Sequence, residues 1–381
     1  MAVTPPLRIV HITPAGGFGR VQHGGAERAV LELAGQSALA GHSVTIIAPG
    51  EFLRAIDPPE GVRTIAAEID PKRVLSLAKV VVELNPDVIV GHLLRGVIVA
   101  GAIRAISGRR AAFVTNLHNS LNQAFEDVDA PKSRRMLLRG TLRALHYGKR
   151  ASTVAISRSN FDDLLEHDRF PSSKVELINN WVAPVFVVGS EEDAQSVKTS
   201  LLSPESSKLA LFVGRLEHQK NPLLAVQAVA GLSTKTTLVV AGDGSLADDL
   251  VAEAERLDVE LRLLGNVKDV ERYMAAADVV LVPSRYEGFG RVAVEALATG
   301  TPVVANSVVG LRDALSPFPP EWYSFSSSEE PAEWTRLVQA KLDEPLDHEL
   351  RKARRSRVMD TYGLTASVDR YLDLYGRLLQ A

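Results

Sequence analysis

The chain has 381 residues, of which 46% are hydrophobic, contains no cysteine and carries a formal net charge of −3. This length exceeds one ordinary core and fits two domains of roughly 150 to 200 residues. The lack of cysteine excludes disulfide bonds, thiolate-bound metals and a thiol nucleophile. No apolar stretch reaches the ~18 residues of a membrane span, and the N-terminal residues lack the pattern of a secretory signal, so we expect a cytoplasmic protein.

Apolar runs alternate with helical patterns through the first half of the chain. Such runs, separated by helices, are typical of a parallel sheet covered on both faces. Residues 1–183 are therefore predicted to form a doubly wound α/β domain with a net charge of +5. The expected strands are 7–13, 44–48, 88–90, 112–116, 153–156 and 175–178, with helices beginning near 25, 71, 94, 132 and 158.

Residues 184–207 interrupt this pattern with polar clusters and are predicted to be a linker. The alternation then resumes, so 208–364 is predicted to form a second doubly wound domain. Its expected strands are 208–213, 237–241, 261–264, 279–282 and 303–305, with helices from 221, 246, 269 and 291. Open parallel sheets bind ligands at the carboxyl ends of their strands, which predicts a central cleft between two such domains.

The stretch 283–295 is the most informative, because Glu287 and Glu295 flank a glycine-rich turn between an expected strand and an expected helix. Amides at a helix start can face an anion. The two carboxylates can accept hydrogen bonds from sugar and ribose hydroxyls. An ordinary strand, turn and helix with two solvated glutamates is the open alternative.

The loop after strand 208–213 carries Arg215 and Lys220 next to Gly214. Two fixed cations beside a glycine that permits close approach suit the charge that grows on a diphosphate leaving group. Further glycine loops follow the next two strands, at Gly242 and at Gly265, and these can frame a nucleobase. The alternative is that the two cations are ordinary surface residues and that the glycine loops are ordinary turns without a ligand.

Glycines also precede the first helix, at Gly24 and Gly25, where the backbone can approach phosphate closely. A dinucleotide fingerprint is not matched, because position 22 is Gln, so nicotinamide chemistry is disfavoured. His118 directly follows strand 112–116 and is expected to point into the cleft. A structural role for a single histidine is the alternative. The acidic pair Asp127-x-Asp129 lies in a polar loop and is not expected to bind a metal.

Several short motifs follow one another along nearly the whole chain. They are Gly24-Gly25-x-Glu27, Ala40-Gly41-His42-x-Val44, His118, Asn179-Asn180-Trp181-Val182, Gly214-Arg215-Leu216, Lys220-Asn221, Gly242-Asp243-Gly244, Glu287-Gly288-Phe289-Gly290 and Glu295-Ala296-Leu297. This ordered set resembles the retaining glycosyltransferases of family four. The resemblance implies the GT-B fold, with two Rossmann-like domains facing a cleft and a final helix, 365–381, that returns to the first domain.

The resemblance also implies an activity. Such enzymes move a hexosyl or N-acetylhexosaminyl unit from a nucleotide diphosphate sugar to a hydroxyl with retention, without a metal or other cofactor, and we expect UDP-sugars rather than GDP-sugars. The implied catalytic residues are His118, Arg215, Lys220 and Glu287. The implied donor-binding residues are Gly24, Gly25, Gly214, Arg215, Lys220, Gly242, Gly265, Asn266, Val267, Glu287, Gly288, Phe289, Gly290, Arg291 and Glu295.

Arg291 departs from the family pattern, which usually has an apolar residue or proline there. Acceptor contacts are expected from Asn119, Arg135, Arg139 and Arg143. A helical pattern places one set of cationic residues on one face, Lys132, Arg135, Arg139, Arg143, His146 and Arg150, and apolar residues on another, Leu137, Leu138, Leu142, Ala144 and Leu145. The basic face suits peripheral contact with anionic lipid at the inner side of the cell membrane, and a solvated arginine-rich face is the alternative. Nucleic acid is disfavoured.

Two other functions remain open. A nucleotide-sugar 2-epimerase shares the architecture and would form product without an acceptor. A bilobal sugar-binding protein would be no enzyme and would carry an export signal. The high Ala, Arg and Val content indicates a GC-rich bacterial gene, which leaves cell-envelope polysaccharide, glycolipid and natural-product glycosylation as pathways.

Overall fold

The computed structural model describes residues 5–14, 24–108, 110–118, 121, 131–146, 148–345 and 347–381. The chain divides into two compact units. Unit 1 comprises Met1–Asn180 together with Leu364–Ala381, and unit 2 comprises Trp181–Gly363. The stretch predicted as a linker therefore lies within unit 2. It contains a helix, α8 (Glu191–Leu201), which begins after Ser190, whose hydroxyl accepts a hydrogen bond from the Asp193 amide.

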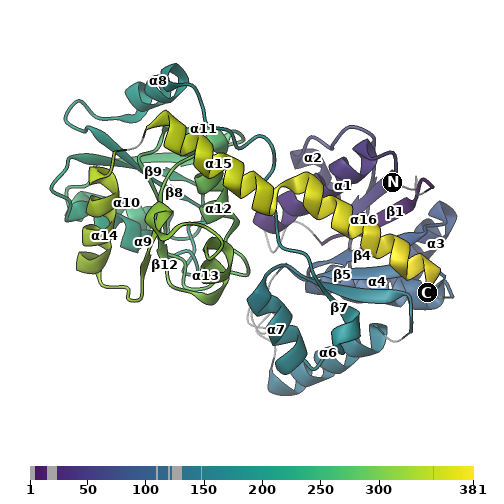
Figure 1. Ribbon diagram of the computed structural model, residues 1–381. Helices are drawn as coiled ribbons and strands as arrows, with labels where there is room; N and C mark the ends of the chain where they lie inside the picture. The colour runs from purple at the N-terminus through teal and green to yellow at the C-terminus, as the bar shows by residue number, and fades with distance from the viewer. Residues whose placement is uncertain are drawn as a thin grey trace. The chain divides into compact units, whose positions relative to one another are not determined.

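Unit 1 is built on seven parallel strands with helices between them (Figure 1). The strands are β1 (Arg8–Ile12), β2 (Ser43–Ala48), β3 (Val62–Ala66), β4 (Val88–His92), β5 (Ala112–Asn116), β6 (Ala151–Ala155) and β7 (Val175–Leu177). The helices are α1 (Gly25–Leu39), α2 (Gly50–Ala55), α3 (Val74–Leu84), α4 (Leu93–Ile106), α6 (Lys132–Leu145), α7 (Arg158–Glu166) and α16 (Leu364–Gln380), with 3₁₀ turns η1 (Pro71–Arg73) and η2 (Ser172–Lys174). The sheet order is β3-β2-β1-β4-β5-β6-β7.

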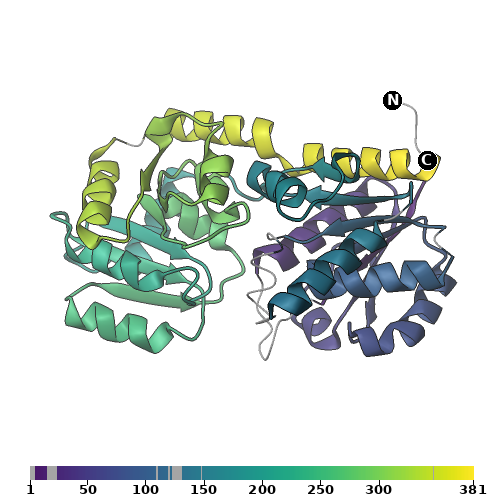
Figure 2. The ribbon, with the colours of Figure 1, turned by 90° about the horizontal axis from the view of Figure 1, so that it is seen from below.

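Helices cover both faces of this sheet. In Figure 2, α16 (yellow) lies along one side of unit 1, and α3 and α4 (blue) lie along the other. Helix α16 packs against α1 and β5, and α4 packs against α3, α6 and β4. One apolar cluster of unit 1 joins α3, α4 and α6 to the central strands through side chains such as Val81, Ile103 and Leu142. The doubly wound topology predicted for the first half is confirmed.

Unit 2 has six parallel strands in the order β10-β9-β8-β11-β12-β13. They are β8 (Lys208–Val213), β9 (Thr236–Ala241), β10 (Leu261–Gly265), β11 (Val279–Val282), β12 (Val303–Asn306) and β13 (Tyr323–Ser326). Besides α8, the helices are α9 (Pro222–Ala230), α10 (Ala247–Arg256), α11 (Val270–Ala276), α12 (Arg291–Ala298), α13 (Val309–Leu315), α14 (Pro331–Asp343) and α15 (His348–Tyr362), with the 3₁₀ turn η3 (Pro320–Trp322).

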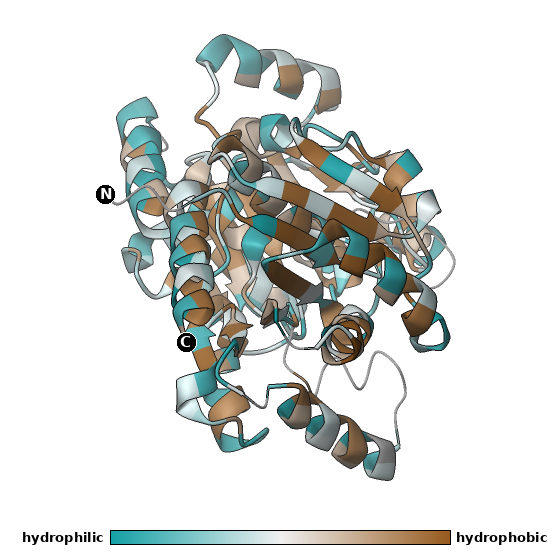
Figure 3. Ribbon diagram, turned by 90° about the vertical axis from the view of Figure 1, so that its right-hand side faces the viewer, coloured by the Kyte–Doolittle hydropathy of each residue, from teal (hydrophilic) through white to brown (hydrophobic). Residues whose placement is uncertain are grey.

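The core of unit 2 lies between its sheet and α9, α10 and α14. Trp334 of α14 is fully buried there and donates its indole N–H to the Ser328 carbonyl at 3.0 Å. The strands of the protein are predominantly brown, and therefore hydrophobic, in Figure 3, whereas the helices alternate between brown and teal. This is the expected colouring for strands buried on both faces and helices that bury one stripe.

The chain enters and leaves unit 2 along adjacent segments. Val182 and Gly363 form an isolated parallel bridge, and the Val182 amide donates to the Tyr362 carbonyl at 2.8 Å. The second residue of unit 2, Val182, and its last residue, Gly363, are thus neighbours. Among the described helices, none is long and apolar enough to cross a membrane.

Candidate functional site

Two loops of unit 2 meet at the carboxyl edge of its sheet. Strands β8 and β11 are parallel neighbours, with Phe212 in register with Leu281, so the segments that follow them emerge side by side. Gln219 joins these loops, because its backbone carbonyl accepts from the Arg285 amide at 2.8 Å and its side-chain Nε2 donates to the Tyr286 carbonyl at 3.1 Å. The structure therefore brings the predicted cation loop and the predicted carboxylate loop together.

Lys220 and Glu287 form an ion pair across this junction. Lys220 Nζ donates to Glu287 Oε1 at 2.5 Å, and the side chains are 17% and 11% exposed. Arg215, from the same loop, is exposed and donates from Nη2 to Gln219 Oε1 at 2.8 Å. Three of the predicted catalytic residues thus lie on two loops that Gln219 holds together, and the role of Gln219 was not foreseen.

A second ion pair lies at the start of α12. Arg291 Nη2 is 3.1 Å from Glu295 Oε1, and the two side chains are 7% and 4% exposed. Spacing of four residues along a helix places such side chains next to one another. A buried carboxylate needs a partner to offset the loss of hydration. Arg291, the residue that departs from the family pattern, therefore supports the carboxylate predicted to bind ribose.

The glycine loops after β8 and β9 are in direct backbone contact. Gly242 has φ of +150°, and a Cβ there would lie 1.9 Å from the Gly214 carbonyl oxygen. Its amide donates to the Gly265 carbonyl at 2.8 Å, which ties in the loop after β10. Only glycine fits this position, so the backbone itself lines this part of the edge. Asn266 and Val267 follow Gly265 on the same loop.

The turn before α12 is anchored by an aromatic side chain. Phe289 is 2% exposed, and its ring packs edge-on against Tyr362 with 5.1 Å between centroids. Gly290, the residue before the helix, has φ of +87°. A Cβ on Gly310 would lie 2.1 Å from the Glu287 carbonyl, so α13 closely supports the turn from its other side.

A neighbouring ion pair was not predicted. Arg285 donates from Nε and Nη2 to the two carboxylate oxygens of Glu329, at 2.8 and 2.7 Å, and holds the pKa of that carboxyl below its usual range. Arg285 belongs to the same 283–295 stretch as Glu287. The position of Arg285 in that stretch could have marked it as a candidate site residue. The neighbouring sequence does not identify Glu329, 44 residues away, as its partner.

In unit 1 the predicted residues Gly24 and Gly25 lie at the start of α1, Gly24 as its N-cap. Residues 15–23 lie outside the described part of the chain. His118 follows β5 in the left-handed region, with φ of +61°, and is 7% exposed. It is not isolated, because its Nε2 is 3.1 Å from His92 Nδ1, and His92 Nε2 is 2.9 Å from His11 Nδ1.

The acceptor-side residues do not form the continuous basic face that was predicted. Arg139 pairs with the buried Asp168 at 2.6 Å, and His146 is buried, with Nδ1 2.7 Å from the Leu142 carbonyl. Exposed cations of this region are Lys132, Arg143 and Lys149, and Arg135 is half-buried. Of the residues assigned to the apolar face, Leu137 is 70% exposed, and its neighbour Met136 is 72% exposed. Asn119 lies outside the described residues.

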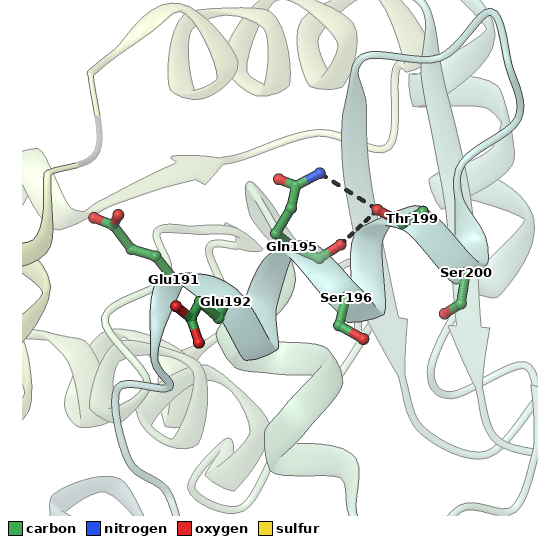
Figure 4. A pocket seen from close by; sticks show the side chains of 6 residues that line it. All are labelled: Glu191, Glu192, Gln195, Ser196, Thr199 and Ser200. Atoms are coloured by element: carbon green, nitrogen blue, oxygen red, sulfur yellow. Dashed lines mark hydrogen bonds between the residues drawn. The ribbon is translucent and has the colours of Figure 1, made fainter.

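One surface hollow lies away from these residues. Figure 4 shows that its lining side chains all come from α8: Glu191, Glu192, Gln195, Ser196, Thr199 and Ser200. Gln195 and Thr199 bond to one another within the helix. A single helix face offers no converging groups, so this hollow is not a site. Nor does any group of three or more His, Cys, Asp or Glu side chains within the described residues converge to hold a metal ion.

Two family models match the chain, one in each half. The model described as Glycosyltransferase Family 4 matches residues 23–185, and the model described as Glycosyl transferases group 1 matches residues 193–357. Together they extend over most of the sequence. The chain belongs to the family-four glycosyltransferases, which have the GT-B fold.

Individual relatives match this chain over different lengths. This chain is 34% identical over 202 residues to D-inositol 3-phosphate glycosyltransferase of Kineococcus radiotolerans, covering 46% of each chain. It is 28% identical over 325 residues to glycogen synthase of Mycobacterium tuberculosis, covering 77% of this chain and 76% of that one. The chain spans about half the length of the first curated relatives it matches.

Solved structures support the fold independently. The crystal structure of Anabaena HepE in complex with UDP and glucose matches with a TM-score of 0.80 at 17% identity, covering 97% of this chain and 99% of that one. At this identity the likeness establishes the architecture alone.

Proposed function

We propose that this protein transfers a hexosyl unit from a nucleotide diphosphate sugar to a hydroxyl group, with retention of the anomeric configuration and without a metal ion. The observation that carries the proposal is the cluster of Arg215, Lys220 and Glu287 at the carboxyl edge of unit 2. Open α/β sheets bind ligands at that edge. Two cations and a carboxylate match the diphosphate and the sugar hydroxyls of such a donor.

Each residue of the cluster has a role in this reaction. Arg215 and Lys220 bind the diphosphate and stabilise the charge that develops as the bond between the sugar C1 and the phosphate oxygen breaks. The acceptor hydroxyl oxygen bonds to C1 on the same face, and its proton passes to the leaving phosphate oxygen. This route requires no pair of general acid and base at the cluster.

Glu295 binds the two hydroxyls of the ribose in this scheme. An ionised carboxylate offers about four lone-pair sites, so the contact with Arg291 leaves others for ribose. Gly242 and Gly265 present backbone groups to the base. A UDP-sugar is the favoured donor, and the UDP and glucose in the structure of Anabaena HepE support that choice.

The surface of α6 supports an acceptor carried at an anionic lipid surface. Met136 and Leu137 project two apolar side chains into solvent, and Lys132, Arg143 and Lys149 are exposed in the same region. Apolar side chains beside cations are the combination that binds anionic bilayers peripherally. The acceptor class is thus a hydroxyl of a glycan or of a lipid-linked intermediate, at the inner face of the membrane.

Nucleotide binding tests the donor site directly. Thermal shift and isothermal titration with UDP, GDP, ADP and their sugars, each with and without magnesium, should show one base preferred and no dependence on the metal. Arg215→Ala and Glu295→Gln should each weaken binding about 10- to 100-fold, since a hydrogen bond to a charged group contributes about 1.5–3 kcal/mol. Arg272→Ala, which removes an exposed cation paired with Asp269, is the matched control and should bind normally.

Product analysis tests the remaining parts. Incubation of the sugar nucleotide with hydroxyl acceptors should give a glycoside whose anomeric configuration, read by NMR, equals that of the donor. Inverted product would contradict retention, and conversion of the sugar nucleotide without any acceptor would favour an epimerase. Binding that requires magnesium and is unaffected by both site variants would overturn the donor site.

A further inference from the structure

Gln219 contacts the side chain of Arg215 through a neutral amide group. Its Oε1 accepts a hydrogen bond from Arg215 Nη2 at 2.8 Å, and its Nε2 donates to the Tyr286 carbonyl at 3.1 Å. The two partners determine which end of the amide is which, because a guanidinium only donates and a carbonyl only accepts. Gln219 therefore sets the direction of the Arg215 side chain relative to the loop that carries Glu287.

The loop that carries Gln219 is itself anchored at several points. The Gln219 carbonyl accepts from the Arg285 amide at 2.8 Å, and the Arg285 side chain donates from Nη1 to the His218 carbonyl at 3.1 Å. The same side chain makes a two-point ion pair with Glu329, in the loop after β13. One arginine thus joins the segments that follow β8, β11 and β13, so Gln219 presents its amide from a fixed backbone.

Arg215 differs in its partners from two other cations at this edge of the sheet. Lys220 is paired with Glu287 at 2.5 Å, and Arg285 is paired with Glu329 at 2.7 Å. Among the described residues, no carboxylate forms an ion pair with Arg215. Its hydrogen-bond partner is the uncharged side chain of Gln219.

Glu217, two residues along the same loop, is bonded elsewhere. Its two carboxylate oxygens accept from the Ser245 amide at 3.0 Å and from the Ser245 hydroxyl at 2.7 Å. These hydrogen bonds hold the pKa of the Glu217 carboxyl below its usual range, and the nearby charge of Arg215 lowers that pKa further. The exposed guanidinium of Arg215 therefore keeps N–H groups and positive charge available for an anion from solvent.

We propose that Gln219 is a positioning residue that orients Arg215 toward the diphosphate of the donor and leaves its charge without a carboxylate partner. This role rests on the proposed function, in which Arg215 binds the diphosphate. A carboxylate in place of the amide would occupy two N–H groups of the guanidinium and neutralise it. An apolar side chain would leave the guanidinium without a fixed direction. A neutral hydrogen-bond acceptor avoids both losses.

Two variants of similar size separate these effects, with inorganic pyrophosphate as the ligand and ³¹P NMR titration of the full chain as the measurement. Gln219→Glu and Gln219→Met both remove the N–H that is donated to Tyr286, so they should lower the melting temperature alike. Gln219→Met should weaken pyrophosphate binding roughly three- to fivefold, because Arg215 must then be immobilised on binding. Gln219→Glu should weaken it at least roughly 20-fold, because the charge is neutralised as well.

A double variant tests whether this loss acts through Arg215. In an Arg215→Ala background, Gln219→Glu should cost less than roughly twofold in pyrophosphate affinity, since no guanidinium is left to neutralise. Ser327→Asp, on an exposed residue of the loop after β13, adds a negative charge at the same edge of the sheet and should bind like the wild type. Equal losses for Gln219→Glu and Gln219→Met, or an undiminished loss in the Arg215→Ala background, would overturn the proposal.

Failure of this proposal and failure of the proposed function give different results. If pyrophosphate binding follows the expected pattern but no sugar nucleotide acts as a donor, the proposed function is wrong and the role of Gln219 in orienting an anion-binding arginine stands. If sugar transfer occurs and the KM for the donor rises equally in both Gln219 variants, the function stands and the role of Gln219 is wrong. A wild-type protein that does not bind pyrophosphate would also overturn the role of Gln219.

Discussion

Two buried tyrosines of α16 differ in whether the hydroxyl is hydrogen-bonded, so replacing each by Phe should change the free energy of unfolding differently. Tyr371 and Tyr375 are both fully buried. Tyr371 Oη accepts a hydrogen bond from Asn116 Nδ2 at 2.6 Å, whereas Tyr375 Oη has no hydrogen-bond partner among the described residues. Tyr371→Phe leaves a buried amide N–H without that acceptor and should lower the free energy of unfolding by about 1–3 kcal/mol. Tyr375→Phe should cost nothing or stabilise slightly. Urea unfolding measures both, and equal losses would contradict the assignment.

Helix α6 exposes two large apolar side chains, Met136 and Leu137, in a region with exposed cations. We expect the protein to sediment with phosphatidylglycerol vesicles and to be released by salt, because each cation near an anionic surface contributes about 1 kcal/mol. The double variant Met136→Ser and Leu137→Ser should weaken this binding at least roughly tenfold, since each apolar side chain can contribute about 1.5–3 kcal/mol when buried.

The control for this element is another exposed leucine of unit 1. Leu75 of α3 is 72% exposed, close to the value for Leu137. Leu75→Ser should leave vesicle binding unchanged. Binding to neutral phosphatidylcholine vesicles as strong as to anionic ones would show that the cations of α6 take no part.

At the scale of the whole molecule, the two units should differ in their sensitivity to acid. The buried histidines of the described residues, His11, His92, His118 and His146, all lie in unit 1. Burial lowers the pKa of His146 to about 4, from a usual value of 6.5. The unfolded state therefore binds more protons below that usual value, and unit 1 loses stability as the pH falls from 6.5 toward 4. Burial also lowers the pKa of His11 and His92, and each of these three histidines contributes at most about 1.4 kcal/mol per pH unit.

Calorimetry at about pH 7.5 and about pH 5.5 tests this difference, in a range above the usual pKa of carboxylates, roughly 4. The unfolding transition of unit 1, identified as the one that Tyr371→Phe lowers, should move down at the lower pH by more than the transition of unit 2. An equal shift of both transitions would contradict the prediction.

Short apolar runs in the sequence predicted the buried strands, because stretches such as Val88 to Val90 are apolar without interruption. The alternation of apolar and helical segments did not predict β3 or β13. Each is an edge strand of its own sheet, where its residues are largely half exposed and polar residues are tolerated. The sequence pattern also predicted a linker in place of α8, because that helix is polar over most of its length.

The residues of the candidate site could be named from the sequence, but their contacts could not. Arg215, Lys220 and Glu287 could be named from their motifs. Lys220 and Glu287 are 67 residues apart, and their pairing depends on the adjacency of β8 and β11, which the sequence order does not state. The same holds for His11 and His92, which lie 81 residues apart on neighbouring strands.

The bridge between Val182 and Gly363 makes unit 2 an insertion within unit 1. Unit 2 is continuous in sequence, whereas unit 1 is interrupted and contains both segments that flank the insertion. During synthesis from the N-terminus, the seven strands of unit 1 therefore leave the ribosome before unit 2, and α16 leaves after it. The hydrogen bond between Asn116 and Tyr371 can therefore form only after all of unit 2 has been translated. Of the two units, unit 1 is therefore begun before unit 2 and completed after it.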